Sequence, residues 1–380
     1  MTTKVGSGST PKGGNAVYTS AGHCFVRSQN VGMGYLILDE IAHINDVIHQ
    51  KHKATELKED DVLLNITGAS IGRTAIATKE IEGGNVNQHV CIIRANSKVN
   101  PKFLCNYIQT KKIQNYIQSL QTGGSREGLN FEQIRSFPIS LPNIAEQNKI
   151  AQLLDKLNER IATQNKIIDK LQSLIKGLND TLYAQHGNEV MTSFAELGTP
   201  YSGLSGKSAQ DFGSGKPFIT YLNVYSNNII NENDFQYVAI KDGEKQNIVE
   251  YGDVLFTLSS ETPNEVGIGS VFLGKEKVYL NSFCFGIHIT NKEVAFPPYL
   301  SYYVSSTAFR KFIYPYAQGS TRFNLCKAGF EKASIKLPTL ENQKRIHSIL
   351  GHIDCKIETE RLLLALYNSQ KQYLLRQMFI

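Results

Sequence analysis

The stretch "LPNIAEQNKIAQLLDKLNERI", residues 141–161, has a second version in the same chain, "LPTLENQKRIHSILGHIDCKI" at residues 337–357. At a constant offset of 196 residues, identical counterparts exist for Leu141, Pro142, Gln147, Ile150, Leu154 and Ile161. The relationship extends upstream, because "FVRSQNV" (25–31) aligns with "FITYLNV" (218–224), and "DVLLNIT" (61–67) aligns with "DVLFTLS" (253–259). A repeat of this length indicates a tandem duplication, in which a mixed domain and a helix occur twice.

The two quoted stretches predict two long helices. After Pro142, Asn143 is a natural N-cap, and Glu146 stands three residues later as in a capping box. Apolar residues then recur at alternating spacings of four and three, which is the pattern of a coiled-coil seam. The predicted seam consists of Ile150, Leu154, Leu157, Ile161, Ile168, Leu171, Ile175, Leu178, Leu182, Ile346, Leu350, Ile353, Ile357, Leu364 and Leu374.

Each of these helices has about 40 residues and would be about 60 Å long, which exceeds a single globular core. The seams could pack on each other or could each bind a helix of another protein. We favour an antiparallel pair within the chain. The seam is interrupted at equivalent positions by Gln164 and Glu360. These two residues could form a buried polar layer that sets the register, or they could face solvent near a partner helix.

The predicted fold class is α+β, with two mixed α/β domains, each followed by one long helix, and with pseudo-two-fold symmetry. We expect one helix over residues 100–120 and one over the equivalent residues 296–316, each beginning at a proline. Only the second copy is preceded by "VMTSFAELG" (190–198), so the first domain either lacks an edge strand or receives one from the C-terminal end. The predicted segments are a first domain, a central helix, a second domain and a C-terminal helix, over residues 1–140, 141–185, 186–336 and 337–380.

The composition, 41% hydrophobic and 19% charged, allows well-packed cores in two or three domains. No apolar run approaches the ~18–20 residues that span a bilayer, and the N-terminus lacks the apolar segment of a signal peptide. The six cysteines form no CxxC pair, so we expect free thiols in a reducing cytoplasm.

The net charge of +6 permits nucleic-acid binding but does not require it. Lys and Arg exceed Asp and Glu by four in residues 1–140, whereas the acidic residues are in excess by one in residues 186–336. Any basic surface must therefore come from the placement of individual charges.

No motif in the chain predicts catalysis, a cofactor or a metal site. "AFPPY" (295–299) has Phe296 where an adenine methyltransferase loop needs Asn or Asp. "GLSGKS" (203–208) lacks the first glycine of a phosphate-binding loop, since that position is Tyr201. Asp46 with "ELK" (56–58) fits a nuclease pattern only loosely, and His49 and His52 lack further ligands at metal-binding spacing. These features favour a binding protein over an enzyme.

The helix opening Leu-Pro-x-x-x-x-Gln, repeated before two long seams, resembles the DNA specificity subunit of type I restriction–modification systems. "SGLSGKSAQDFG" (202–213), "SSETPNEVG" (259–267) and "YLNSFCFG" (279–286) resemble one class of the recognition domains of that family, and "NITGASIGRTAI" (65–76) and "SREGLNFEQI" (125–134) resemble another. The resemblance covers essentially the whole chain.

The resemblance implies a non-catalytic subunit that binds double-stranded DNA and holds methyltransferase subunits and, through them, restriction/translocase subunits. Each domain would read half of a bipartite site, and the helix pair would set the unread spacer. A scaffold that binds only proteins is the alternative. Neighbouring methyltransferase and helicase–nuclease genes would decide between these two functions.

Base reading needs side chains that reach base edges: Arg for guanine, Asn or Gln for adenine, Ser or Thr for either. In the first domain the candidates are Arg27, Gln29, Ser70, Arg73, Gln88, His89, Ser125 and Arg126. In the second they are Tyr221, Asn223, Ser260, Thr262, Ser282, Thr321 and Arg322. Several could merely close turns, and for Asn223 and its counterpart Asn30 we favour that role. Arg126 and Arg322 are equivalent, so we expect them to contact the DNA backbone rather than different bases.

Overall fold

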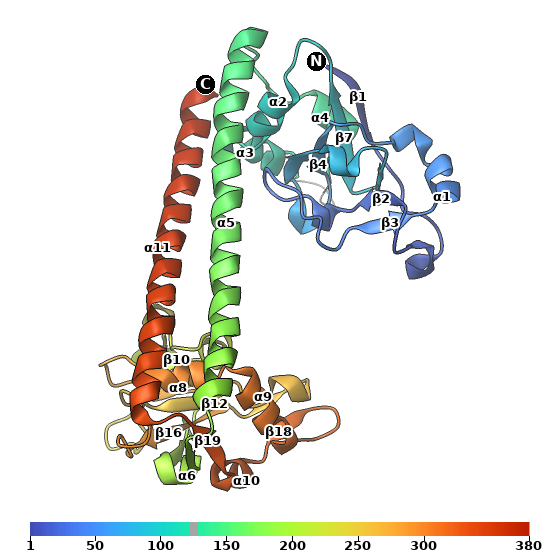
Figure 1. The fold of residues 1–380 in the computed structure, drawn as a ribbon. Coiled ribbons are helices and arrows are strands. Elements are labelled where there is room, and N and C mark those ends of the chain that lie inside the picture. Colours follow the sequence, from blue (N-terminus) through green and yellow to red (C-terminus); the bar gives the residue numbers. More distant parts are fainter. Residues whose placement is uncertain (122–127, 380) are drawn as a thin grey trace. The chain divides into compact units, whose positions relative to one another are not determined.

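The computed structural model describes residues 1–121 and 128–379. The chain forms two compact units: unit 1 is Met1–Lys166 with Arg361–Ile380, and unit 2 is Ile167–Glu360. Each unit contains one mixed domain and parts of both long helices (Figure 1). The four segments that we predict from the sequence are consecutive stretches, whereas each unit combines stretches that are far apart in the chain or parts of several segments. The division into four segments therefore stays a prediction.

Unit 1 is built on a four-stranded antiparallel sheet in the order β1-β7-β4-β5. Alternate residues of β4 face opposite sides: Val62 and Leu64 belong to the core with the helices, whereas Leu63 belongs to the core with the smaller sheet β3-β2-β6. The strands are β1 (Thr2–Ser7), β2 (His23–Val26), β3 (Ala42–Ile44), β4 (Val62–Asn65), β5 (Thr74–Ile76), β6 (Asn85–Val86) and β7 (Val90–Ala95). The helices of this domain are α1 (Asp46–Lys51), α2 (Pro101–Ile108), α3 (Lys111–Ser119) and α4 (Phe131–Arg135).

Unit 2 repeats this arrangement with the equivalent sheet order β9-β16-β12-β14. Again Val254 and Phe256 of β12 face the core with the helices, and Leu255 faces a separate core. The strands are β8 (Val190–Thr192), β9 (Gly198–Ser202), β10 (Phe212–Ile219), β11 (Gln236–Val238), β12 (Val254–Thr257), β13 (Ser259–Ser260), β14 (Gly269–Val271), β15 (Tyr279–Leu280), β16 (Cys284–Ile289), β17 (Ala317–Gln318), β18 (Phe323–Leu325) and β19 (Ile335–Leu337). The helices are α6 (Phe194–Leu197), α7 (Tyr221–Ser226), α8 (Pro297–Tyr303), α9 (Thr307–Ile313) and α10 (Lys327–Lys332).

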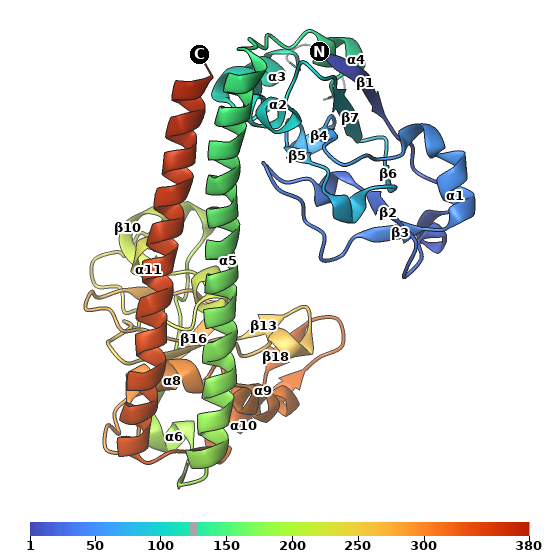
Figure 2. The same cartoon turned by 45° about the horizontal axis from the view of Figure 1, so that its top comes forward.

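The two predicted long helices are α5 (Ile144–His186) and α11 (Leu340–Met378), which lie side by side (Figures 1 and 2). In unit 1, Leu154 near the start of α5 shares a core with Leu375 near the end of α11. In unit 2, Leu182 near the end of α5 shares a core with Leu350 near the start of α11. The pairing is therefore antiparallel and intramolecular, as predicted.

All predicted seam residues are buried or half-buried. Gln164 and Glu360 are also buried, with exposed fractions of 5% and 7%. Their burial argues against the role in which they face solvent.

The single helix predicted over residues 100–120 is wrong, because the structure divides it into α2 and α3. Thr110 ends the first helix and caps the second, since its Oγ1 accepts a hydrogen bond from the Ile113 amide at 3.4 Å. Ser306 does the same between α8 and α9, accepting from the Phe309 amide at 3.1 Å. A hydroxyl at an N-cap position competes with helix continuation, and it does so at equivalent places in both copies.

The extra segment of the second copy forms β8, which pairs with β19. Among the described residues of unit 1, no strand pair corresponds to β8 and β19. The C-terminal end of the chain does contribute to unit 1, but through the end of α11 and Phe379, which packs on Phe103 and Tyr107 with ring centroids 5.0 and 5.1 Å apart.

The repeated glutamine of the quoted stretches joins each domain to its helix. In unit 1, Gln147 Oε1 accepts from the Asn100 amide at 2.9 Å, while its Nε2 donates to the carbonyls of Lys98 and Pro142 at 3.2 and 2.9 Å. In unit 2, Gln343 makes the equivalent bonds to the Phe296 amide and to two carbonyls. Both side chains are buried, with exposed fractions of 1% and 0%.

Candidate DNA-binding interface

Four loops of each unit carry the residues that we predict from the sequence. We name them loop A (27–30 and 220–223), loop B (67–73 and 259–267), loop C (87–89 and 281–283) and loop D (122–128 and 319–324). Loops A, B and C each lie directly beside a strand at equivalent places in the two copies, whereas residues 122–127 of loop D lie outside the described residues.

In unit 1, backbone hydrogen bonds beside these loops bring them together. The Asn87 amide of loop C donates to the Val26 carbonyl before loop A at 3.0 Å. The Ile66 amide before loop B donates to the His89 carbonyl at 3.0 Å, and the Leu129 amide after loop D donates to the Ile66 carbonyl at 2.8 Å. Loops A, B and C and the residue after loop D are therefore brought together.

Unit 2 contains the same three bonds. The Asn281 amide donates to the Ile219 carbonyl at 3.0 Å, the Leu258 amide to the Phe283 carbonyl at 2.9 Å, and the Leu325 amide to the Leu258 carbonyl at 2.8 Å. The duplicated backbone thus brings loops A, B and C and the residue after loop D together in the same way twice, while the side chains on these loops differ.

The candidates of unit 1 lie on this surface where they are described. Gln29, Arg73 and Gln88 are exposed, whereas Arg27, Ser70 and His89 are half-buried. Ser125 and Arg126 lie outside the described residues. The guanidinium of Arg27 lies 5.6 Å from the ring centroid of Tyr18, and its buried Nε has no hydrogen-bond partner among the described residues. An unpaired donor of this kind is suited to an acceptor that a bound partner supplies.

Two polar side chains of loop C in unit 1 are held by neighbours. His89 Nδ1 lies 2.6 Å from Thr67 Oγ1, and Gln88 Oε1 accepts a hydrogen bond from Thr10. The amide Nε2 of Gln88 is 3.1 Å from Nε2 of His89. These contacts orient both side chains on the surface before any partner binds.

In unit 2, Thr262, Ser282, Thr321 and Arg322 are exposed, and Tyr221 and Ser260 are half-buried. The Tyr221 hydroxyl donates to the Ser259 carbonyl at 2.8 Å, and Arg322 Nη2 donates to Ser259 Oγ at 3.4 Å. Burial raises the pKa of Tyr221, so its phenol stays a hydrogen-bond donor at neutral pH. Loops A, B and D thus meet at Ser259.

Asn30 and Asn223 hold loop A in shape in both units. Asn223 is fully buried, its Nδ2 donates to the Asn231 carbonyl at 2.9 Å, and its Oδ1 accepts from the Asn231 amide at 3.0 Å. Asn30 is likewise buried and donates to the Ile37 carbonyl at 2.9 Å. Both positions favour the turn-closing role over base contact.

Sequence reasoning did not select Glu265, which lies at the centre of loop B in unit 2. Its carboxylate accepts hydrogen bonds from the Tyr225 hydroxyl at 2.8 Å and from Ser260 Oγ at 2.9 Å. These hydrogen bonds, that from Tyr225 foremost, hold the pKa of Glu265 below its usual value, so it is charged at neutral pH. A carboxylate in this position can accept a hydrogen bond from the amino group of cytosine.

Arg310 was also missed, because it lies in α9, far from loop B in sequence. Its guanidinium donates to the carbonyls of Asn264, Val266 and Gly267 at 2.7, 2.8 and 2.9 Å. In unit 1 the equivalent residue is Gln114, whose Nε2 donates to the Gly72 carbonyl at 3.0 Å. Both residues fix the end of loop B.

Replacing Arg310 with Met should loosen loop B of unit 2, because three carbonyls lose their donor. We expect discrimination within one half of the DNA target to fall about tenfold, the cost of roughly one misread base pair. The measurement is binding to a set of duplexes with single base changes in both half-sites. Arg310→Gln, which copies unit 1, should retain most discrimination, and Gln114→Met should affect the other half-site. Equal loss at both half-sites would contradict this role.

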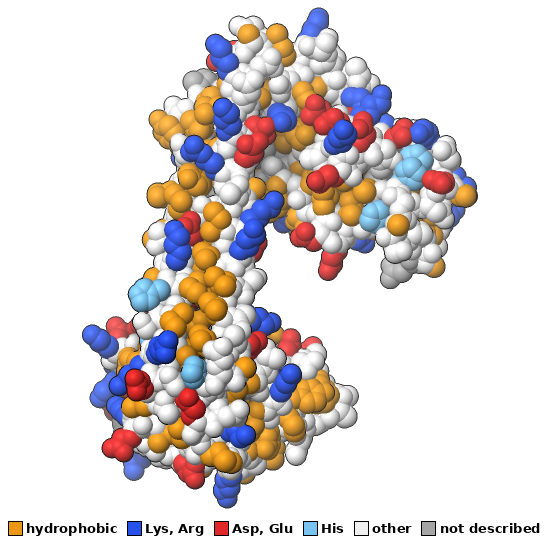
Figure 3. Space-filling model, viewed as in Figure 1, with side chains coloured by type: hydrophobic (Ala, Val, Ile, Leu, Met, Phe, Trp, Pro, Cys, Tyr) orange, Lys and Arg blue, Asp and Glu red, His pale blue; other side chains and the backbone are white. Residues whose placement is uncertain are grey.

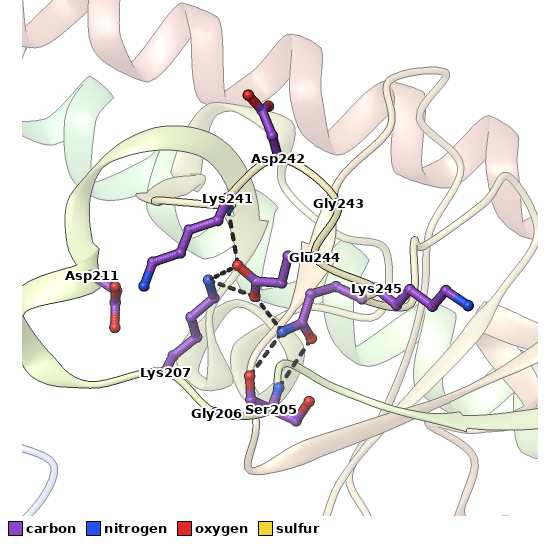
Figure 4. Close-up of a pocket in the computed structure, with 10 residues that line it drawn as sticks. Ser205, Gly206, Lys207, Asp211, Lys241, Asp242, Gly243, Glu244 and Lys245 are labelled. Carbon is purple, nitrogen blue, oxygen red and sulfur yellow. Dashed lines mark hydrogen bonds and ion pairs between the residues drawn. The ribbon is translucent and has the colours of Figure 1, made fainter.

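The "GLSGKS" stretch lines a polar cavity of about 510 Å³ in unit 2 (Figure 4). Lys207 is 2.6 Å from Glu244 and also donates to the Ala239 carbonyl at 2.6 Å. The hydrogen bond from Lys207 helps to lower the pKa of Glu244 to about 2. Because this lysine is neutralised by a carboxylate, the cavity does not resemble a phosphate-binding loop.

Charged side chains of both signs are interspersed over each unit on the face that Figure 3 shows. In the part of the chain that the structure describes, no cluster of three or more His, Cys, Asp or Glu side chains is arranged to hold a metal ion. None of the helices there has an apolar stretch long enough to cross a membrane.

Residues 12–173 and 205–366 each match the family described as the type I restriction modification DNA specificity domain. The MjaX type I restriction enzyme specificity subunit of Methanocaldococcus jannaschii is 22% identical over 369 residues, covering 90% of this chain and 82% of that protein. The EcoBI specificity subunit of Escherichia coli is 23% identical over 167 residues, which cover 42% of this chain and 34% of that protein.

Two solved structures share the fold. The S subunit of a type I restriction–modification system from M. genitalium superposes with a TM-score of 0.52 at 14% identity, covering 99% of this chain and 93% of that one. A chain from a study of complex assembly and conformational transition of the type I R-M system gives a TM-score of 0.57 at 16% identity, covering 94% and 91%.

Proposed function

This chain belongs to the type I restriction modification DNA specificity family, and from that premise we propose that each of its units reads one half of a bipartite DNA target. The chain is a sequence-specific DNA-recognition subunit without catalytic activity of its own. It binds double-stranded DNA and assembles with methyltransferase and restriction/translocase subunits. The alternative, a scaffold that does not read DNA, has no support from the family match.

The observation that carries the proposal is the duplicated surface of loops A, B and C. The backbone bonds that join the loops are the same in both units, whereas the exposed side chains differ, as in Gln29 and Leu222 or Gln88 and Ser282. A shared backbone with different side chains is what two domains need in order to read two different half-sites. We propose that the helix pair sets the spacer between them and that the subunit acts in the cytoplasm.

Methylation profiling of host DNA tests the function directly. The expected result is a methylated motif with two specified halves around an unspecified spacer. A gel shift of the complex with methyltransferase subunits should then show tighter binding to that motif than to random duplex, by about a thousandfold or more. Equal binding to both duplexes would refute the function.

Replacing Arg322 with Ala should weaken binding to all duplexes alike, because we assign this exposed residue to the phosphate backbone. The slope of log K against log salt concentration should become shallower by about one. The neighbouring Thr321→Ala, at a candidate base-reading position, should instead change the preferred sequence. A changed preference in Arg322→Ala would contradict its assignment; Arg126→Ala in unit 1 should behave like Arg322→Ala.

A further inference from the structure

Two large apolar side chains are exposed on the loop surface of unit 2. Leu222 of loop A is 67% exposed, and Phe283 of loop C is 56% exposed. The equivalent positions in unit 1 are Gln29 and His89, both polar. The two units therefore differ in chemistry at two corresponding places.

The backbone enforces this exposure. In α7, Val224 is fully buried, and Leu222 lies two residues earlier, on the other side of the helix. The amide of Phe283 donates to Asn281 Oδ1 at 2.9 Å, and the next residue, Cys284, is fully buried in β16. Neither apolar side chain can reach a core without disrupting the packing of its neighbour.

Both side chains adjoin the place where the loops meet. Leu222 follows Tyr221, whose hydroxyl donates to the Ser259 carbonyl at 2.8 Å. The Phe283 carbonyl accepts from the amide of Leu258, the residue before Ser259, at 2.9 Å. The apolar groups are thus part of the proposed DNA-reading surface rather than scattered elsewhere on the unit.

Apolar side chains offer a phosphate neither a charge nor a hydrogen-bond donor, so base edges rather than phosphates are the partner of Leu222 and Phe283 on a duplex. Loop B carries the carboxylates of Glu261 and Glu265, and acidic residues are in excess by one in residues 186–336. The apolar group that a DNA duplex presents in its major groove is the C5-methyl group of thymine, which Leu and Phe side chains can cover.

We propose that Leu222 and Phe283 contact the C5-methyl group of a thymine in the half-site that unit 2 reads. This inference rests on the proposed function and names one feature of its target. Unit 1, with Gln29 and His89 at these positions, reads its half-site without this contact.

The test uses the complex with methyltransferase subunits and a duplex that carries the motif found by methylation profiling. Each thymine is replaced in turn by deoxyuridine, which removes only the methyl group. We expect one replacement in the half-site of unit 2 to weaken binding about fourfold, the effect of removing one buried methyl group. In a Leu222→Ala/Phe283→Ala variant, the same replacement should have no effect.

The exposed Met191 of β8 provides a matched control, since Met191→Ala should keep the full sensitivity to deoxyuridine. Any of three results would overturn the proposal: a unit 2 half-site made of G·C pairs alone, binding that no deoxyuridine affects, or equal sensitivity to deoxyuridine in the double variant. If Leu222 or Phe283 instead inserted as a wedge between base pairs, binding would not depend on the methyl group, and no deoxyuridine would affect it. Loss of preference for the motif over random duplex would instead refute the function itself.

Discussion

Inserting one heptad into α5 after Lys166 and one into α11 after Glu360 is expected to lengthen the preferred spacer of the DNA target by about three base pairs. Seven helical residues add about 10 Å, and duplex DNA rises about 3.4 Å per base pair. The insertion preserves the apolar seam because the seam repeats every seven residues. The original target should lose about a thousandfold in affinity, since one half-site alone approaches non-specific binding.

The new spacer should be bound less tightly than the original spacer. Three base pairs rotate the duplex by about 100°, given 10–10.5 base pairs per turn, whereas a heptad changes the direction of a helix face by only about 20°. The measurement is selection from a library in which both half-sites are fixed and the spacer varies. An insertion into α5 alone serves as a control, since it makes the two helices unequal in length, so that their ends no longer match, and should reduce binding at every spacing. An unchanged preferred spacer in the double insertion would refute the role of the helices as a ruler.

The long helices could be predicted because their determinants are local. Asn143 precedes α5, and its Oδ1 accepts from the Glu146 amide at 2.9 Å, as expected for an N-cap. The breaks at Thr110 and Ser306 were missed because a hydroxyl residue is compatible with either a helix interior or a cap. Only the surrounding packing decides between these possibilities.

The loops of the candidate site were predicted from the repeat, but the roles of individual residues were not. Arg310 acts on residues more than 40 positions away, as shown by its bond to the Gly267 carbonyl at 2.9 Å. Leu222 and Phe283 were not predicted, because base reading was expected of polar side chains. Neither a long-range hydrogen bond nor the exposure of an apolar residue can be read from local sequence.

Replacing Gln343 with Met is expected to lower the free energy of unfolding of unit 2 by about 3–5 kcal/mol. The methionine has nearly the same length but leaves the Phe296 amide and the carbonyls of Val294 and Pro338 without their partner. Each unpaired buried polar group costs about 1–3 kcal/mol. This interaction explains why the glutamine occurs in both quoted stretches, whereas most residues around it have changed.

Hydrogen–deuterium exchange under mild denaturant would measure this effect separately in the two units. In Gln343→Met, faster exchange should appear around residues 290–300 and 338–350, and Gln147→Met should produce the same change around the start of α5 in unit 1. Gln370→Leu, at an exposed position of α11, should have little effect. If Gln343→Met exchanged like the native chain, the glutamine would not be the joint between domain and helix. A loosened joint should also broaden the range of spacers that the complex accepts, because a ruler defines a distance only when both of its ends are fixed.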